Sequence, residues 1–190
     1  KSGLAPATVL RGPRQVGKTT LLNQVIETLL GEGVEPHRIL RVQFDELPSL
    51  RDVSEPILEI PRWFSENILR RSFNDAARDG KPAFIFLDEV QNLPDWAPQL
   101  KHLVDMHAVK AFVTGSSALR IEEGRDSLAG RVFTINLGPL LLREIAALRD
   151  MGTFTPFATS NGIRHFLEAK FWTDLRDYGI ANRKLRDEAF

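Results

Sequence analysis

The chain has 190 residues, 43% hydrophobic and 26% charged, an ordinary globular composition that argues against a wholly disordered chain. Its 25 basic and 25 acidic residues cancel, so no overall electric field draws it to nucleic acid or to an anionic membrane. The longest apolar run, residues 83–87, is far shorter than the roughly 20 residues that span a bilayer. The chain contains no Cys, which excludes disulfides, and we expect a cytoplasmic protein without a membrane segment.

Short apolar segments alternate with longer helical patterns along the first part of the chain, an order typical of parallel β-α-β units. Strands are predicted at residues 7–11, 39–44, 83–87, 109–113 and 132–137. Helices are predicted at residues 18–30, across most of 55–78, and at 96–107. We therefore predict an α/β fold of three layers, with helices on both faces of a mainly parallel five-stranded sheet.

A smaller helical region is predicted beyond the last strand. One helical pattern begins near Leu141, and a segment at 151–162, rich in Gly, Ser, Thr and Pro, separates it from a second pattern. We expect a core domain at residues 1–150 and, at 151–190, a partial helical lid or the start of a further C-terminal region. The chain begins at Lys1 and stops at Phe190 within a helical pattern, so we also expect a fragment of a longer protein.

The segment between the first predicted strand and helix reads Gly-Pro-Arg-Gln-Val-Gly-Lys-Thr and fits the pattern of a phosphate-binding loop. Glycines permit the tight turn that aims successive N–H groups at a polyphosphate, and the following helix adds the positive end of its dipole. Lys18 is expected to reach the β- and γ-phosphates, and the Thr19 hydroxyl to hold Mg²⁺. The position between strand and helix favours this loop over a surface turn with a solvated lysine. The residues predicted to contact the ligand are Gly12, Pro13, Arg14, Gln15, Val16, Gly17, Lys18, Thr19 and Thr20.

Two carboxylates, Asp88 and Glu89, directly follow the most apolar predicted strand. Asp88 is expected to serve the Mg²⁺ shell, and Glu89 to orient and deprotonate an attacking water. Adjacent acidic residues at the end of a strand are common, but a pair that follows a phosphate loop in the sequence indicates a nucleotide-hydrolysing site. A phosphotransferase acting on a small substrate would not need a water-activating base, so Glu89 favours hydrolysis.

Two further segments carry candidate catalytic residues. Thr114 and Ser116 close the fourth predicted strand, where a hydroxyl could bond the γ-phosphate or the water, or cap an ordinary turn. Arg131 precedes the last predicted strand, and arginine suits the charge that develops on a transferring phosphoryl group. Arg120 and Arg125 are rival candidates, and a solvated or salt-bridged Arg131 is the alternative interpretation.

These four motifs in this order resemble an AAA-type P-loop ATPase, most closely a bacterial and archaeal group with GPRQVGKT, LDEVQ, TGSS and LAGR motifs. The resemblance covers residues 7 to about 148. It implies that Lys18 and Thr19 bind phosphate and Mg²⁺, that Asp88 serves the Mg²⁺ and that Glu89 activates water. It assigns a sensor role to Thr114 or Ser116.

The resemblance implies a function as well as a fold. We expect a domain that binds ATP with Mg²⁺ and hydrolyses it to ADP and phosphate, driving conformational change in a larger protein. The alternative is a slow signalling switch that binds ATP with little turnover. An arginine donated by a neighbouring copy would imply a homo-oligomer, and nucleic acid is expected as a partner only of the full-length protein. Members of the group usually continue into a C-terminal domain that resembles a restriction endonuclease, which this sequence does not display.

Overall fold

The computed structural model describes residues 6–46, 50, 53–115, 128–151, 168–184 and 187. The chain forms two compact units, Lys1–Gly138 and Pro139–Phe190. The first unit contains a five-stranded sheet in the order β2-β3-β4-β1-β5, and every pairing in it is parallel. The strands are β1 (Ala7–Arg11), β2 (Ile39–Gln43), β3 (Phe84–Asp88), β4 (Lys110–Gly115) and β5 (Val132–Asn136). The predicted α/β class and all five strands are therefore confirmed.

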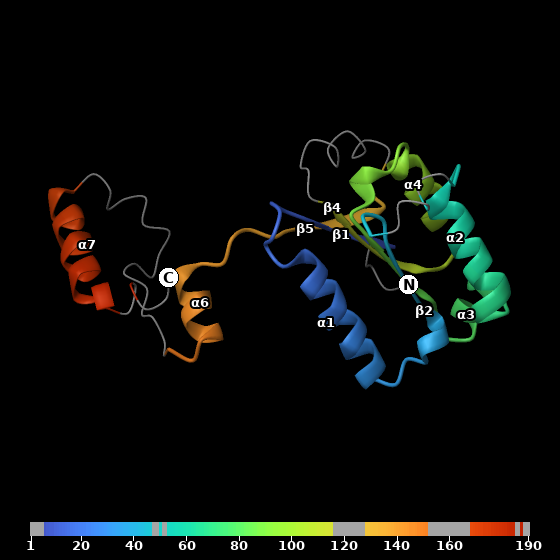
Figure 1. Cartoon of the computed structure of the whole chain (residues 1–190), viewed down its shortest axis with the longest axis horizontal. Coiled ribbons are helices and arrows are strands. Elements are labelled where there is room, and N and C mark those ends of the chain that lie inside the picture. The colour runs from blue at the N-terminus through green and yellow to red at the C-terminus, as the bar shows by residue number, and fades with distance from the viewer. Residues whose placement is uncertain are drawn as a thin grey trace. The chain divides into compact units, whose positions relative to one another are not determined.

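Helices cover both faces of the sheet (Figure 1). They are α1 (Lys18–Gly31), α2 (Pro56–Phe64), α3 (Phe73–Arg78) and α4 (Trp96–Met106). Shorter turns complete the unit, namely the 3₁₀ turns η1 (Pro36–Arg38) and η4 (Val90–Asn92) and the π-helical turn η3 (Ser65–Leu69). The three layers predicted from the sequence are present.

The core has two parts because side chains alternate between the faces of each strand. Ile85 and Leu87 of β3 belong to a large cluster with buried residues of α2, α3 and α4, such as Leu100. Phe86 points to the other face and packs in a cluster with Leu22 of α1. A strand buried on both faces reads as a continuous apolar run, which is why residues 83–87 were recognisable in the sequence.

The predicted helix across residues 55–78 is interrupted. The π-helical turn η3 ends at Leu69. Arg70, the next residue, is left-handed with a φ of 56°, and the N–H of Arg71 donates to Ser65 O at 3.2 Å. Helix α3 then begins at Phe73, and the hydroxyl of Ser72 before it accepts the N–H of Asp75 at 3.1 Å. This N-cap satisfies a backbone donor that has no partner inside the helix, so it allows a new helix to begin after the break.

The strand order brings the phosphate loop, Asp88 and Thr114 to one edge of the sheet. Strand β4 lies between β1 and β3, with Thr114 in register with Leu10 and Val113 in register with Leu87. The carboxyl ends of parallel strands lie at the same edge. Thr114 therefore sits between the strand that enters the phosphate loop and the strand that ends at Asp88.

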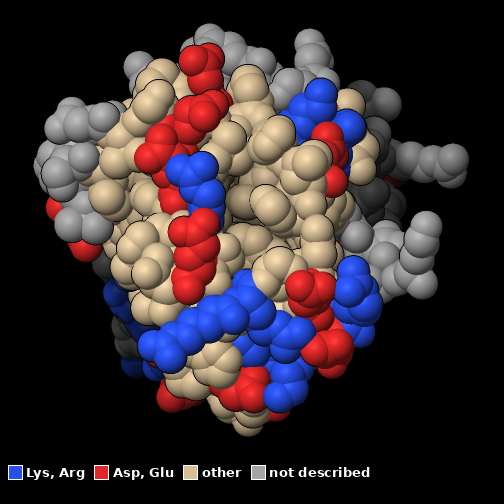
Figure 2. Space-filling model, turned by 90° about the vertical axis from the view of Figure 1, so that its right-hand side faces the viewer, with Lys and Arg blue, Asp and Glu red and all other residues tan. Residues whose placement is uncertain are grey.

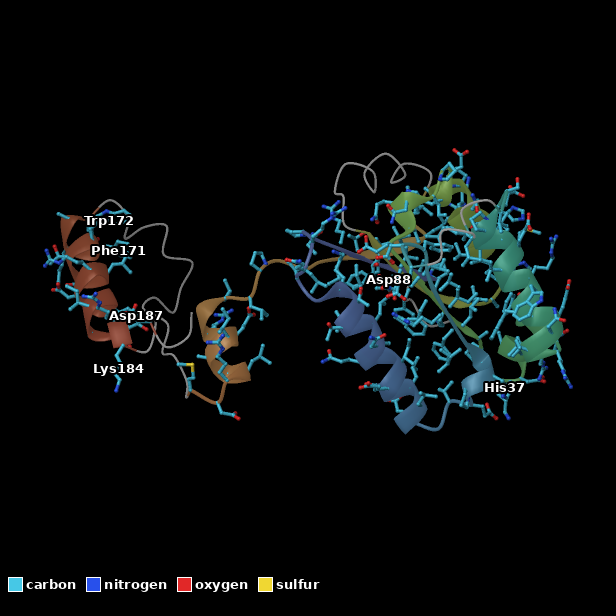
Figure 3. All side chains as sticks on the ribbon, viewed as in Figure 1. His37, Asp88, Phe171, Trp172, Lys184 and Asp187 are labelled. Carbon is cyan, nitrogen blue, oxygen red and sulfur yellow. The ribbon has the colours of Figure 1, made fainter. Side chains whose placement is uncertain are left out.

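The second unit contains the helices α6 (Leu142–Leu148) and α7 (Ala169–Ala181). Figure 3 labels Phe171 and Trp172 on α7, whose rings meet edge to face with centroids 5.3 Å apart. A lid role for this unit stays a prediction. In the parts of the chain that the structure describes, no helix is both long and apolar enough to cross a membrane.

Candidate nucleotide-binding site

The phosphate loop connects β1 to α1 and is open to solvent. Gln15 and Gly17 have φ values of 63° and 90°, so the backbone reverses direction immediately before the helix starts at Lys18. Pro13, Arg14 and Gln15 are exposed. The first N–H groups of α1 have no acceptor within the helix, so they are available to an anion at its N-terminus.

Lys18 lies folded into this loop and is only 4% exposed. Its Nζ donates to Pro13 O at 2.8 Å and to Gly12 O at 3.2 Å. A lysine is almost never fully buried without partners, and these two carbonyls hold its ammonium within the loop. The arrangement places a positive charge where the loop backbone also presents donors, which fits a polyphosphate.

Thr19 and Asp88 meet across the site. Thr19 Oγ1 donates to Asp88 Oδ2 at 2.8 Å, although the two residues are 69 positions apart in the sequence. Asp88 is completely buried at the end of β3, and Figure 3 shows it in the interior of the first unit. Hydroxyl and carboxylate oxygens are the ligands that Mg²⁺ prefers, so this pair fits the ion that was predicted for it.

Thr114 bridges the two acidic residues. Its hydroxyl donates to Asp88 Oδ1 and accepts the backbone N–H of Glu89 at 3.0 Å. A hydroxyl has one hydrogen to donate, and here that hydrogen goes to Asp88. Thr114 is fully buried, and its sensor role stays a prediction.

Glu89 follows Asp88 in an unusual backbone conformation. Its φ and ψ are 59° and 43°, a left-handed region that non-glycine residues occupy at a cost of about 1–3 kcal/mol. The reversal turns the chain from β3 into η4. Gln91 Nε2 donates to Glu89 Oε2 at 2.5 Å, a contact that our sequence analysis did not predict. The signal was present, because Gln91 belongs to the LDEVQ motif, but the motif alone did not assign it a role.

Of the remaining candidates, Arg131 is the one that the structure describes, and it is not brought to the loop. Arg131 lies just before β5, at the opposite, amino-terminal edge of the sheet, where its Nε donates to Asp105 Oδ1 at 2.6 Å. This hydrogen bond lowers the pKa of Asp105 and raises the pKa of Arg131, so the pair stays ionised at neutral pH. Ser116, Arg120 and Arg125 lie outside the described residues.

Comparison with known proteins agrees with the fold. A family model described as an AAA domain matches residues 5–146, and the chain belongs to this family. The uncharacterized protein MJ1637 of Methanocaldococcus jannaschii is 32% identical over 136 residues, which cover 72% of this chain and 26% of that protein. The uncharacterized protein Rv2008c of Mycobacterium tuberculosis is 30% identical over 148 residues, which cover 75% of this chain and 27% of that protein.

The chain therefore spans about a quarter of the length of these relatives. Its family membership supports a nucleotide-binding function of the ATPase type.

Proposed function

We propose that this chain is an ATPase domain that hydrolyses ATP to ADP and phosphate with Mg²⁺ and drives conformational change in a larger protein. The observation that carries the proposal is the continuous chain of contacts from the phosphate loop to the candidate base. Thr19 contacts Asp88, Asp88 contacts Thr114, and Thr114 contacts Glu89. A solvated surface turn would need no such connection to the Asp88 carboxylate and the Glu89 backbone N–H at the end of another strand.

Each residue has a defined part in this proposal. Lys18 and the N–H groups of the loop would hold the polyphosphate, and Thr19 and Asp88 would hold the Mg²⁺. The bound ion would supply positive charge to the phosphoryl oxygens. Glu89 takes a proton from water as the water oxygen bonds to the γ-phosphorus. The bond from that phosphorus to the β,γ-bridging oxygen breaks, and the proton on Glu89 then passes to solvent.

Two substitutions test the proposal. Lys18→Ala removes the ammonium that would hold the phosphates, so both ATP binding and turnover should be lost. Glu89→Gln removes the base but keeps the shape, so ATP should still bind while turnover falls about 10²–10⁴-fold. Binding is measured by titration with a fluorescent ATP analogue, and turnover by phosphate release.

The same pair of variants separates an ATPase from a switch. In a slow switch, the wild-type turnover would already be close to that of the Lys18→Ala blank. Glu89→Gln would then bind ATP as the wild type does and would lower the turnover very little. A Lys18→Ala protein that bound ATP normally would contradict the proposed site in either case.

A further inference from the structure

Gln91 lies two residues after the candidate base and is almost completely buried, at 6% exposure. Its side-chain amide contacts the Glu89 carboxylate, with 2.5 Å between Nε2 and Oε2. We infer that Gln91 is a positioning residue that holds the Glu89 carboxylate in place for proton transfer. This inference rests on the proposed function and adds a residue to it.

The conformation of Glu89 explains why its carboxylate needs such a partner. A long acidic side chain on a left-handed residue at a strand exit has several rotamers open to it. The backbone is held at one end, where the Glu89 N–H donates to Thr114 Oγ1. Gln91 holds the other end of the residue, at Oε2. With both ends held, we expect Oε1 to be the oxygen that accepts the proton.

A glutamine suits this role better than other polar residues. A carboxylate only accepts hydrogen bonds, and the amide Nε2 provides a donor without adding a charge that would compete for the proton. A glutamate at position 91 would repel Glu89. A methionine has nearly the same length and volume but lacks the donor, so Gln91→Met removes the contact while it preserves the packing.

A second buried glutamine provides a matched control. Gln99 of α4 is 5% exposed, accepts the N–H of Ile57 at 3.1 Å and donates to Pro94 O at 3.3 Å. These bonds link α4 to α2 and to the preceding turn. Gln99→Met therefore removes buried hydrogen bonds of similar kind without touching Glu89.

The test compares kcat, KM for ATP and thermal stability of the intact protein and these variants. Gln91→Met should lower kcat about tenfold and change KM less than about twofold, because misplacing a base affects chemistry more than substrate binding. Gln99→Met should lower the melting temperature and leave kcat at the wild-type value. Equal kcat in Gln91→Met and wild type, or an equal loss of kcat in Gln99→Met, would overturn the inference.

A double substitution connects the effect to Glu89. In the Glu89→Gln background, Gln91→Met should cause no further loss of kcat, because both changes act on the same proton transfer. A further tenfold loss would overturn the inference and leave the proposed function standing. A wild type with no turnover above the Lys18→Ala blank would contradict the proposed function itself, and the role of Gln91 would fail with it.

Discussion

At the scale of single residues, the hydroxyl of Thr114 joins the Asp88 carboxylate to the Glu89 backbone. The sequence could place a hydroxyl residue at this strand end, and the strand order agrees. It could not indicate where the hydrogen would point, because that depends on the buried Asp88 carboxylate lying within reach of the hydroxyl. Gln91 was missed for a related reason, since its contact depends on a left-handed turn at Glu89 that the residue type does not favour.

Replacing Thr114 with the isosteric Val should damage both stability and turnover. The change leaves Asp88 Oδ1 and the Glu89 N–H without this partner, and a buried polar group without a partner costs about 1–3 kcal/mol. We expect a lower melting temperature and a kcat reduced about tenfold or more. Thr114→Ser keeps the hydroxyl and should recover most of the kcat. Wild-type values in Thr114→Val for both thermal unfolding and phosphate release would show that the bridge has no role.

At the scale of elements, the phosphate loop depends on the strand beside it as well as on its own sequence. The Leu137 N–H donates to Arg11 O at 2.7 Å, so the chain leaving β5 runs along the start of the loop. A Cβ added at Gly12 would lie 2.1 Å from Leu137 O. The sequence analysis explained the loop glycines by their freedom to turn, whereas at Gly12 the structure shows close backbone approach as the reason.

Substituting Gly12 with Ala should therefore destabilise the first unit. The clash is with backbone, which cannot rotate away, so we expect a loss of about 1–3 kcal/mol, as for other overpacked sites. Gly31→Ala is the matched control, because an added Cβ there meets nothing within 4 Å and alanine favours the helix that Gly31 ends. Chemical denaturation of both variants measures the difference, and equal stability would contradict this account of the loop.

The elements themselves were predicted with unequal success for physical reasons. The central strand β3 is buried on both faces and reads as an apolar run, so its position was evident in the sequence. The break in the helix predicted at 55–78 could not be recognised in the sequence. Arg70 is an ordinary helix former, and its left-handed conformation follows from the π-helical turn before it.

At the scale of the whole molecule, a net charge of zero conceals an uneven surface. Figure 2 shows acidic side chains gathered along the upper part of one face and basic side chains across the lower part. Ion pairs offset some of this charge, including Arg71 with Asp79 and Lys81 with Glu35. Hydrogen bonds from Arg38 and Lys81 lower the pKa of Glu35 to about 2, so it stays ionised at neutral pH.

The catalytic role expected of Arg131 also belongs to this scale, because an arginine donated by a neighbouring copy implies a homo-oligomer. Arg131 lies at the edge of the sheet opposite its own phosphate loop, so it would serve the loop of a neighbouring copy. Arg131→Ala should then lower turnover by a factor within about 10³–10⁵ and leave ATP affinity nearly unchanged. Asp105→Ala removes the ion pair but keeps the arginine, so its turnover should not fall. Equal losses of turnover in Arg131→Ala and Asp105→Ala would mean that the ion pair affects turnover only through the stability of the fold.

The most direct test of the central claim is phosphate release from MgATP by the wild type and Lys18→Ala, measured side by side over a range of protein concentrations. We predict a wild-type rate above that of Lys18→Ala, with a specific rate that rises with concentration as copies donate Arg131 to one another. A wild-type rate equal to that of Lys18→Ala at every concentration would contradict the assignment of this site as an ATPase.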